Sequence, residues 1–226
     1  MRLPRPDMVL IDLDGTLVDS VPDLANCVDA TMGELGLPLR GEAAVRKWVG
    51  NGVERLVKRA LLGRLEGEPD SQLFERALAI FQRCYGESPA ARSCLYPGVI
   101  DGLDYLRSLG LSMGCVTNKA ERFTLPILEA MGIRHYFGVV VSGDTLEEKK
   151  PDPEPLRYAA RALGADPRRS LMLGDSKSDV TAARAAGFRI VCVSYGYNHG
   201  EDIRDSHPDA VIDSLGELPA LLEEAA

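Results

Sequence analysis

Residues that could do chemistry gather at the end of one apolar run near the start of the chain, Met8-Val9-Leu10-Ile11-Asp12-Leu13-Asp14-Gly15-Thr16. The apolar residues do not alternate with polar ones, which is typical of a central parallel strand covered on both faces. Because strand side chains alternate between faces, Asp12 and Asp14 should point the same way. A divalent cation would remove the repulsion between two close carboxylates, and the amides after Gly15 can point at an anion. The run therefore predicts a buried strand that ends in a site for a metal and a phosphoryl group.

Two simpler interpretations fit the same residues. One is an ordinary acidic turn after a strand, and the other is the start of a calcium-binding loop. An EF-hand loop would need further ligands at Thr16 and Val18 and a glutamate where the chain has Asp23. The calcium loop is therefore disfavoured, and the choice between a turn and a catalytic site depends on the rest of the chain.

The composition is that of a soluble globular protein, with 45% hydrophobic and 27% charged residues among 226. A net charge of −8 without a basic stripe argues against nucleic acid or an anionic membrane as a partner. The five cysteines are scattered and form no CxxC pair, which disfavours a disulfide framework or a zinc site. The N-terminus has no signal-peptide pattern, and no run of about 18 apolar residues occurs. We expect a cytoplasmic protein, monomer or homodimer, that binds a small anionic substrate.

A purely helical segment follows the first strand. Apolar residues recur there at helical spacing in four stretches, without a strand between them. The predicted helices cover residues 21–35, 42–49, 53–61 and 73–85. We therefore expect an all-helical domain at residues 19–91, inserted into a core made of residues 1–18 and 92–226.

Strands and helices alternate in the second part of the chain. The predicted strands are 111–117, 139–142, 170–174, 190–193 and 210–212, and the predicted helices are 99–109, 120–131, 153–163, 179–186 and 214–223. Such alternation predicts an α/β fold with a doubly wound, parallel, Rossmann-like sheet and right-handed crossovers. Ligands of these folds bind beyond the carboxyl ends of the strands.

Polar residues collect at those strand ends. Thr117-Asn118-Lys119 lies at the end of one predicted strand, Lys149-Lys150-Pro151-Asp152-Pro153 lies in the loop after the next, and Gly174-Asp175-Ser176-Lys177-Ser178-Asp179 ends the third. Each cluster alone has an ordinary explanation as a strand end, a solvated lysine pair or a helix cap. Their joint occurrence at the sheet edge that also carries Asp12 favours a catalytic site.

Together with Asp12-Leu13-Asp14-Gly15-Thr16, these clusters resemble the four motifs of the haloacid dehalogenase (HAD) superfamily of phosphatases, in order and spacing. The resemblance covers the full length, and the helical insert resembles the C1 cap of that superfamily. It implies that Asp12 attacks phosphorus and forms an aspartyl-phosphate, and that Asp14 acts as general acid and base. It also implies Mg²⁺ held by the Asp12 and Asp175 carboxylates and the Asp14 carbonyl.

The resemblance gives the remaining motif residues supporting roles. Thr117 and the amide of Asn118 would donate to the phosphoryl group, with Thr16 also assigned to the substrate. Lys150 would offset charge on nucleophile and phosphate, with Lys149 as the competing choice. The residues assigned to orient water or Lys150, without binding the metal directly, are Ser176 and Asp179.

The helical insert should decide which ester is bound. Val45-Arg46-Lys47-Trp48-Val49-Gly50-Asn51-Gly52, with other insert residues, resembles the bacterial phosphatases that hydrolyse 2-phosphoglycolate. A glycine turn before a helix presents free amides to an anion. We therefore expect Gly50, Asn51 and Gly52, with Arg55, to bind the substrate carboxylate, although an interhelical turn with solvated charges is the simpler explanation.

Other functions remain open or are disfavoured on specific residues. A phosphatase or mutase acting on a small sugar phosphate would use the same core. A haloalkanoate dehalogenase is disfavoured by Asp14, which supplies the acid and base of phosphoryl transfer. A receiver-like phospho-acceptor module, from a different class, is disfavoured because receivers are uncapped and lack a counterpart of the Gly174-Asp175-Ser176 cluster.

Overall fold

A six-stranded parallel sheet forms the centre of the molecule in the computed structural model, which describes residues 2–222. The strand order is β5-β4-β1-β6-β7-β8, and all neighbouring pairs are parallel. The strands are β1 Met8–Ile11, β4 Ser112–Val116, β5 Val139–Val141, β6 Ser170–Gly174, β7 Arg189–Val193 and β8 Ala210–Ile212. The predicted doubly wound α/β fold is therefore confirmed.

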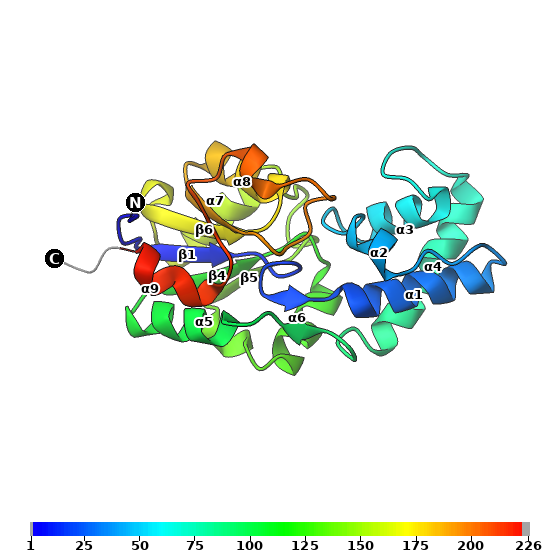
Figure 1. Cartoon of the computed structure of the whole chain (residues 1–226), viewed down its shortest axis with the longest axis horizontal. Helices are drawn as coiled ribbons and strands as arrows, with labels where there is room; N and C mark the ends of the chain where they lie inside the picture. Colours follow the sequence, from blue (N-terminus) through cyan, green and yellow to red (C-terminus); the bar gives the residue numbers. More distant parts are fainter. Residues whose placement is uncertain (1, 223–226) are drawn as a thin grey trace.

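Helices cover both faces of this sheet (Figure 1). They are α5 Val99–Ser108, α6 Glu121–Ala130, α7 Glu154–Leu163, α8 Lys177–Ala186 and α9 Leu218–Leu221. In Figure 1, α7 and α8 lie on one face, and α5, α6 and α9 lie on the other. A sheet buried on both faces requires strands that are apolar throughout, which explains why the predicted strands lacked alternation.

Strand β1 lies in the middle of the sheet, between β4 and β6, with Ile11 opposite both Cys115 and Leu173. Its side chains pack alternately into the two core layers. Val9 and Ile11 belong to one hydrophobic cluster, and Met8 and Leu10 belong to the other. All four side chains are fully buried. Burial of this strand on both sides fixes the position at which the next residue, Asp12, leaves the sheet.

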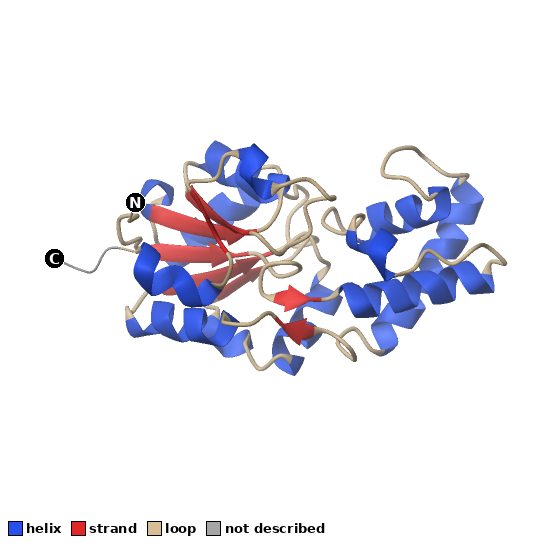
Figure 2. Ribbon diagram, viewed as in Figure 1, coloured by secondary structure: helices blue, strands red, loops and turns tan. Residues whose placement is uncertain are grey.

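The inserted segment forms a helical lobe beside the sheet (Figure 2). Its helices are α1 Val21–Glu34, α2 Glu42–Arg46, α3 Val53–Leu62 and α4 Ser71–Glu87. The segments that enter and leave the lobe pair as two short antiparallel strands, β2 Val18–Asp19 and β3 Cys94–Leu95. These strands were not predicted, because two residues carry no detectable periodicity. They bring the two connections side by side.

Asp23 ties the two connections together at the base of the lobe. Its buried carboxylate accepts hydrogen bonds from the amides of Arg92 at 3.0 Å and Ser93 at 2.7 Å, and from the Ser93 hydroxyl at 2.6 Å. The first turn of α1 therefore supplies the acceptor for the returning chain, which holds the entering and returning segments together.

Two predicted helices differ from those observed by more than two residues at one end. Helix α2 stops at Arg46 instead of residue 49, because the chain tightens into turns that end at Gly50, where φ is +127°. The predicted helix 214–223 is a 3-10 turn, Leu215–Glu217, followed by α9. Pro219 lacks an amide proton and fits the first turn of a helix, where that proton would have no partner, so the α-helix begins just before it. Glu223 lies outside the described residues.

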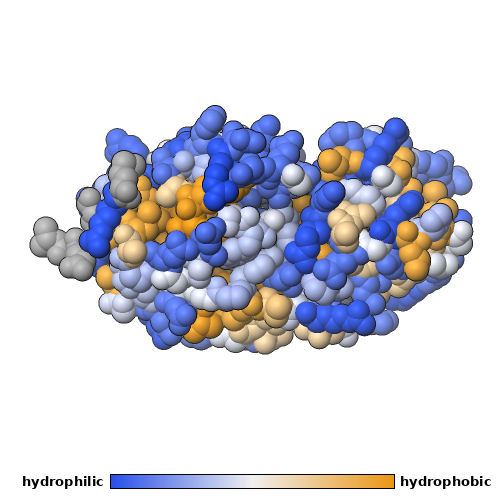
Figure 3. Space-filling view, viewed as in Figure 1, coloured by the Kyte–Doolittle hydropathy of each residue, from blue (hydrophilic) through white to orange (hydrophobic). Residues whose placement is uncertain are grey.

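The face of the molecule in Figure 3 is largely hydrophilic, with several apolar areas among the polar residues. Within residues 2–222, no helix is both long enough and apolar enough to cross a membrane. This agrees with the composition, in which charged residues are spread along the whole chain.

Candidate active site

Asp12 lies directly after β1, and its amide continues the sheet by donating to the carbonyl of Leu173 at 2.9 Å. The residue is 7% exposed, and its Oδ1 lies 2.6 Å from the Lys150 ammonium. Burial raises the pKa of Asp12 to about 7, with Lys150 opposing the rise and the Asp179 carboxylate adding to it. Asp12 is therefore a buried acid with one cationic partner and excess negative charge around it.

Lys150 donates three hydrogen bonds from its ammonium group inside the site. It donates to Asp12 Oδ1 at 2.6 Å, to Asp179 Oδ1 at 2.7 Å and to the carbonyl of Val116 at 2.7 Å. Burial alone would lower its pKa, but the two carboxylates raise it above the ordinary lysine value, so Lys150 is charged. The neighbouring Lys149 is exposed, and the Lys150–Pro151 peptide bond is cis. The structure thus brings Lys150, and not Lys149, to Asp12.

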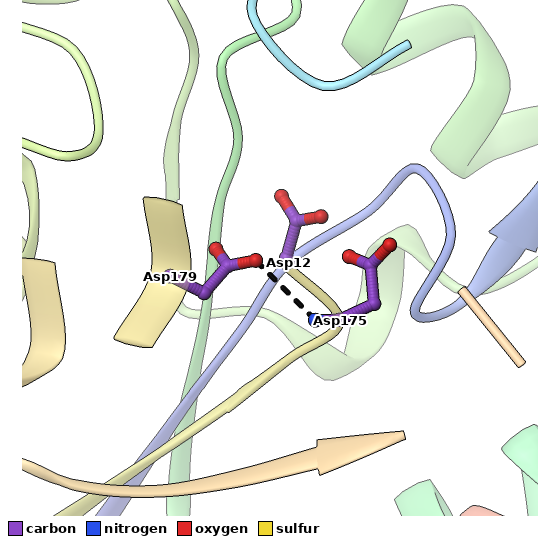
Figure 4. A group of neighbouring side chains, drawn as sticks. All are labelled: Asp12, Asp175 and Asp179. Atoms are coloured by element: carbon purple, nitrogen blue, oxygen red, sulfur yellow. Dashed lines mark hydrogen bonds between the residues drawn. The ribbon is translucent and has the colours of Figure 1, made fainter. Parts of the chain in front are cut away.

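Asp175 and Asp179 complete an acidic cluster with Asp12 (Figure 4). One oxygen from each carboxylate lies within 4.8 Å of the others. Burial, and then the charges of Asp12 and Asp179, raise the pKa of Asp175 well above its usual range. Such a cluster of oxygen donors with uncompensated negative charge fits a divalent cation.

Asp179 has a second task at the start of α8. Its Oδ2 accepts from the amide of Ser176 at 3.1 Å, the hydroxyl of Ser176 at 2.6 Å and the amide of Asp175 at 3.3 Å. Ser176 in turn caps the helix by accepting from the Asp179 amide. Both Asp179 oxygens are thus engaged, one with Lys150 and one with the loop. Asp179 therefore connects Lys150 to the loop that carries Asp175.

Asp14 is held by a different cation. The Lys119 ammonium lies 2.9 Å from Oδ1 and 2.8 Å from Oδ2 of Asp14, and the Ser20 hydroxyl donates to Oδ1 at 2.6 Å. Ser20 precedes α1, but its hydroxyl makes no capping hydrogen bond to the helix. The Ser20 side chain therefore holds Asp14 and does not cap the helix.

The residues after β4 connect the sheet edge to the helical lobe. The Thr117 hydroxyl accepts from the Lys119 amide at 3.2 Å, which leaves its proton available for another acceptor. Asn118 Nδ2 donates to the Lys150 carbonyl at 2.9 Å and to the Gly50 carbonyl at 3.2 Å. Asn118 therefore links the lysine loop of the core to the glycine turn of the lobe.

Most of the predicted site residues line one cavity between the sheet edge and the helical lobe. These are Asp12, Asp14, Thr117, Asn118, Lys150, Asp175, Ser176, Asp179, Gly50 and Gly52. The volume open to the centre of a water-sized molecule is about 40 Å³, which corresponds to about three waters. The lobe thus lies close over the site and leaves room only for a small ligand.

Three of the predicted site residues lie elsewhere. The Thr16 hydroxyl is buried and donates to Asp175 Oδ1 at 3.1 Å. Asn51 and Arg55 line surface depressions beside the cavity. The Arg55 guanidinium pairs with Glu66 at 2.7 Å and Glu68 at 3.0 Å. Of the predicted glycine turn, Gly50 and Gly52 therefore face Asp12, whereas Asn51 and Arg55 do not line that space.

A family model described as "Haloacid dehalogenase-like hydrolase" matches residues 9–193, which contain every residue of this cavity except Tyr197. The chain belongs to this family. A phosphoglycolate phosphatase of Nitrosococcus oceani is 61% identical over 99% of this chain and 100% of its own length. One of Thiobacillus denitrificans is 46% identical over 96% of each chain. A crystal structure titled as a predicted phosphoglycolate phosphatase from Haemophilus somnus superposes with a TM-score of 0.90, at 36% identity, covering 96% of this chain and 98% of that one.

Around this haloacid dehalogenase-like site, the segment after β7 supplies contacts that the sequence reasoning missed. The Tyr197 amide donates to Asp175 Oδ2, and the Tyr197 hydroxyl accepts from the Ser20 amide at 3.0 Å. Gly196 packs so closely on Asp175 that an added Cβ would lie 2.1 Å from the aspartate Cβ. The sequence did hold a signal for these contacts, because Gly196 and Tyr197 come shortly after the predicted strand 190–193, whose carboxyl end lies at the same sheet edge as Asp12.

Lys119 is the second residue that the prediction left without a role. It follows Thr117 and Asn118 directly, and its side chain is buried with Asp14 in the cavity of this haloacid dehalogenase-like hydrolase. Its position after the strand end was a usable signal. The sequence could not show that Asp14 is its partner, because 105 positions separate Lys119 from Asp14.

Proposed function

We propose that the chain is a Mg²⁺-dependent phosphatase that hydrolyses 2-phosphoglycolate to glycolate and phosphate. Support for the substrate comes from the relatives named phosphoglycolate phosphatase, one of them 61% identical over almost the whole chain. Support for the chemistry comes from one observation above all. Asp12 is a buried carboxylate at a sheet edge, 2.6 Å from a charged lysine and beside two further carboxylates.

In this proposal Asp12 attacks the phosphorus of the ester. The P–O bond to glycolate breaks as the Asp12–phosphorus bond forms, and an aspartyl-phosphate results. Water then attacks that phosphorus, releases phosphate and restores the Asp12 carboxylate. Because Lys150 holds one Asp12 oxygen at 2.6 Å, the carboxylate has a fixed orientation from which its other oxygen can react.

Asp14 handles the protons of both steps. It protonates the leaving oxygen of glycolate, and it later accepts a proton from the attacking water. Asp14 lines the same cavity as Asp12, and the Ser20 hydroxyl and the Lys119 ammonium hold its carboxylate in place. An acid fixed beside the nucleophile can give a proton to the leaving oxygen in the first step and take one from water in the second.

The transferred phosphoryl group would be held by residues of two loops. Lys150 offsets its negative charge, the Thr117 hydroxyl has a proton to donate, and the Asn118 amide adds a second donor. Asp12 and Asp175, with the Asp14 carbonyl, would hold Mg²⁺, whose chemistry is to neutralise charge on the phosphoryl oxygens. Asp179 and Ser176 would hold the loop that carries Asp175.

We further propose that residues 19–91 act as a cap over a core of residues 1–18 and 92–226. Gly50, Gly52 and apolar residues of α3 line the cavity from the lobe side, and Asn118 bonds across to Gly50. A closed cap excludes bulk water from the reacting phosphate and admits only small esters.

A panel of phosphate monoesters, compared by kcat/KM in the presence of Mg²⁺, tests the proposed substrate. We expect 2-phosphoglycolate to exceed 3-phosphoglycerate, glucose 1-phosphate and glucose 6-phosphate. If kcat/KM for a sugar phosphate exceeds that for 2-phosphoglycolate by about tenfold, the substrate is a sugar phosphate and not 2-phosphoglycolate. Phosphoryl transfer between sugar positions without release of phosphate would indicate a mutase.

A further inference from the structure

We propose that Lys119 binds the carboxylate of the substrate and so determines the preference for 2-phosphoglycolate over uncharged esters. This assignment rests on the proposed function and deepens it. It moves recognition of the second anionic group from Arg55 of the helical lobe to a lysine at the edge of the sheet.

The substrate is short, and this restricts where its carboxylate can lie. In 2-phosphoglycolate the carboxylate carbon is two covalent bonds from the leaving oxygen, each roughly 1.5 Å long. The leaving oxygen receives its proton from Asp14 and therefore lies against the Asp14 carboxylate. The group that binds the substrate carboxylate must then lie next to Asp14, within hydrogen-bond reach of the same space.

Lys119 lies in that space. Its Nζ is 2.9 Å and 2.8 Å from the two oxygens of Asp14, and the residue lines the cavity that contains Asp12. It is 5% exposed, so water screens its charge only weakly. An ammonium group has three donors, and two of them suffice for the Asp14 oxygens. The third donor can reach a carboxylate bound beside Asp14.

Tyr85 of α4 provides a second contact at this position. The Lys119 ammonium lies 5.1 Å from the centroid of the Tyr85 ring, and the ring is fully buried. The Tyr85 hydroxyl has no hydrogen-bond partner among residues 2–222. A buried hydroxyl without a partner is costly, and it is more readily explained beside a site where a ligand binds.

The other cations near the cavity are already engaged. Among residues 2–222, the lysines and arginines that line it are Lys119 and Lys150. Lys150 uses all three donors on Asp12, Asp179 and a carbonyl, and it lies on the phosphoryl side of the site. Arg55 pairs with two glutamates outside the cavity. Lys119 is thus the cation best placed for the carboxylate.

The test compares two esters that differ in the group to be recognised. 2-Hydroxyethyl phosphate has the same leaving oxygen and adjacent carbon as 2-phosphoglycolate, but it carries an uncharged hydroxymethyl group in place of the carboxylate. The quantity measured is the ratio of kcat/KM for 2-phosphoglycolate to kcat/KM for 2-hydroxyethyl phosphate. It is measured for the wild type, for Lys119→Met and for the control Lys177→Met. Lys177 is exposed and does not line the cavity, so it reports the general effect of removing one positive charge.

We expect Lys119→Met to lower this ratio by about 30-fold, because a charge-assisted hydrogen bond is lost for one ester only. Lys177→Met should change it by less than about threefold, since an exposed charge acts weakly at a distance. If Lys119 only positions Asp14, both esters lose activity in parallel and the ratio stays constant, which would overturn the assignment. A fall in the ratio for Arg55→Met with none for Lys119→Met would also overturn it.

A second variant at position 119 covers the case in which Lys119→Met does not fold. Lys119→Gln retains a hydrogen-bond donor without the charge, and it replaces Lys119→Met if thermal unfolding shows that the methionine variant is not folded. For Lys119→Gln the ratio should fall by about fivefold, which is less than for Lys119→Met, because a neutral amide can still donate a weaker hydrogen bond to the carboxylate. A wild-type enzyme that does not prefer 2-phosphoglycolate to 2-hydroxyethyl phosphate would contradict the proposed substrate itself. That failure is distinguishable, because it requires no variant.

Discussion

At the scale of single residues, two adjacent lysines have opposite environments. Lys150 is buried between Asp12 and Asp179, whereas Lys149 is exposed. Lys150→Met should destabilise the protein by about 3 to 5 kcal/mol, because it leaves buried carboxylates without their cation. It should also lower kcat by at least about 100-fold, through loss of charge compensation on the phosphoryl group.

Lys149→Met is the matched control for that substitution. It removes the same charge one position earlier, and its stability should stay within about 0.5 kcal/mol of the wild type. Urea unfolding and steady-state kinetics measure the two effects separately. Equal effects of the two substitutions would contradict the assignment of Lys150 to the site.

The site residues that could be predicted from the sequence share a simple property. Asp12, Asp175 and the Thr117-Asn118 pair each lie at the end of an apolar strand, so their location at one sheet edge follows from the parallel direction of the strands. The partner of Asp14 could not be predicted in this way. Lys119 is 105 positions from Asp14, and only the parallel pairing of β1 with β4 brings them together.

At the scale of elements, close packing of the β7 segment on Asp175 gives a sharp prediction. An alanine Cβ at position 196 would lie 2.1 Å from the Asp175 Cβ and 2.4 Å from its Oδ2. Gly196→Ala should therefore displace Asp175 and raise the Mg²⁺ concentration required for half-maximal activity by about tenfold or more. A titration of activity against Mg²⁺ measures this.

Gly86→Ala is the control for the same chemical change. Gly86 is within α4 and has no atom within 4 Å of an added Cβ. That substitution should stabilise the protein by about 0.5 to 1 kcal/mol, because alanine loses less backbone entropy in a helix. Unchanged Mg²⁺ dependence in Gly196→Ala would show that Asp175 does not need its observed position.

The connections between core and lobe depend on Asp23. Asp23→Ala leaves two amides and one hydroxyl of residues 92–93 without their acceptor. We expect a loss of about 3 kcal/mol in the free energy of unfolding, because buried donors lose a charged partner. Glu75→Ala, at an exposed position of α4, should change it by less than about 0.5 kcal/mol. A similar small change in both variants by urea unfolding would contradict the structural role of Asp23.

Element boundaries were predictable where a special residue marks them. Gly187, which has a φ of +89°, ends α8 as expected, whereas β2 and β3 escaped prediction because each has two residues. Helix α8 begins at Lys177, two residues earlier than expected. The capping pair of Ser176 and Asp179 explains this, because the aspartate is the third helical residue and not the cap.

At the scale of the whole molecule, the cavity carries an excess of negative charge. Four carboxylates, from Asp12, Asp14, Asp175 and Asp179, line it with two ammonium groups. A divalent cation would offset this excess, so Mg²⁺ should stabilise the folded protein even without substrate. At about 100 times its dissociation constant, the stabilisation should be about 2.7 kcal/mol.

Thermal unfolding with and without Mg²⁺ measures this effect independently of activity. The midpoint should rise with Mg²⁺ and return to its starting value after chelation. NaCl at equal ionic strength should produce a much smaller rise, because screening acts weakly on buried charges. An Asp175→Asn variant should lose most of the response. Equal shifts with NaCl and Mg²⁺ would contradict a specific cation site.

The central claim is that Asp12 becomes covalently phosphorylated during turnover. The most direct measurement mixes the enzyme with excess 2-phosphoglycolate and Mg²⁺, quenches with acid within milliseconds and reduces the acyl phosphate with borohydride. Reduction converts a phosphorylated aspartate to homoserine, which peptide mass spectrometry locates. We predict homoserine at position 12, and none there when substrate is omitted. Homoserine at Asp14 or Asp175 instead, or normal turnover by Asp12→Asn, would contradict the account.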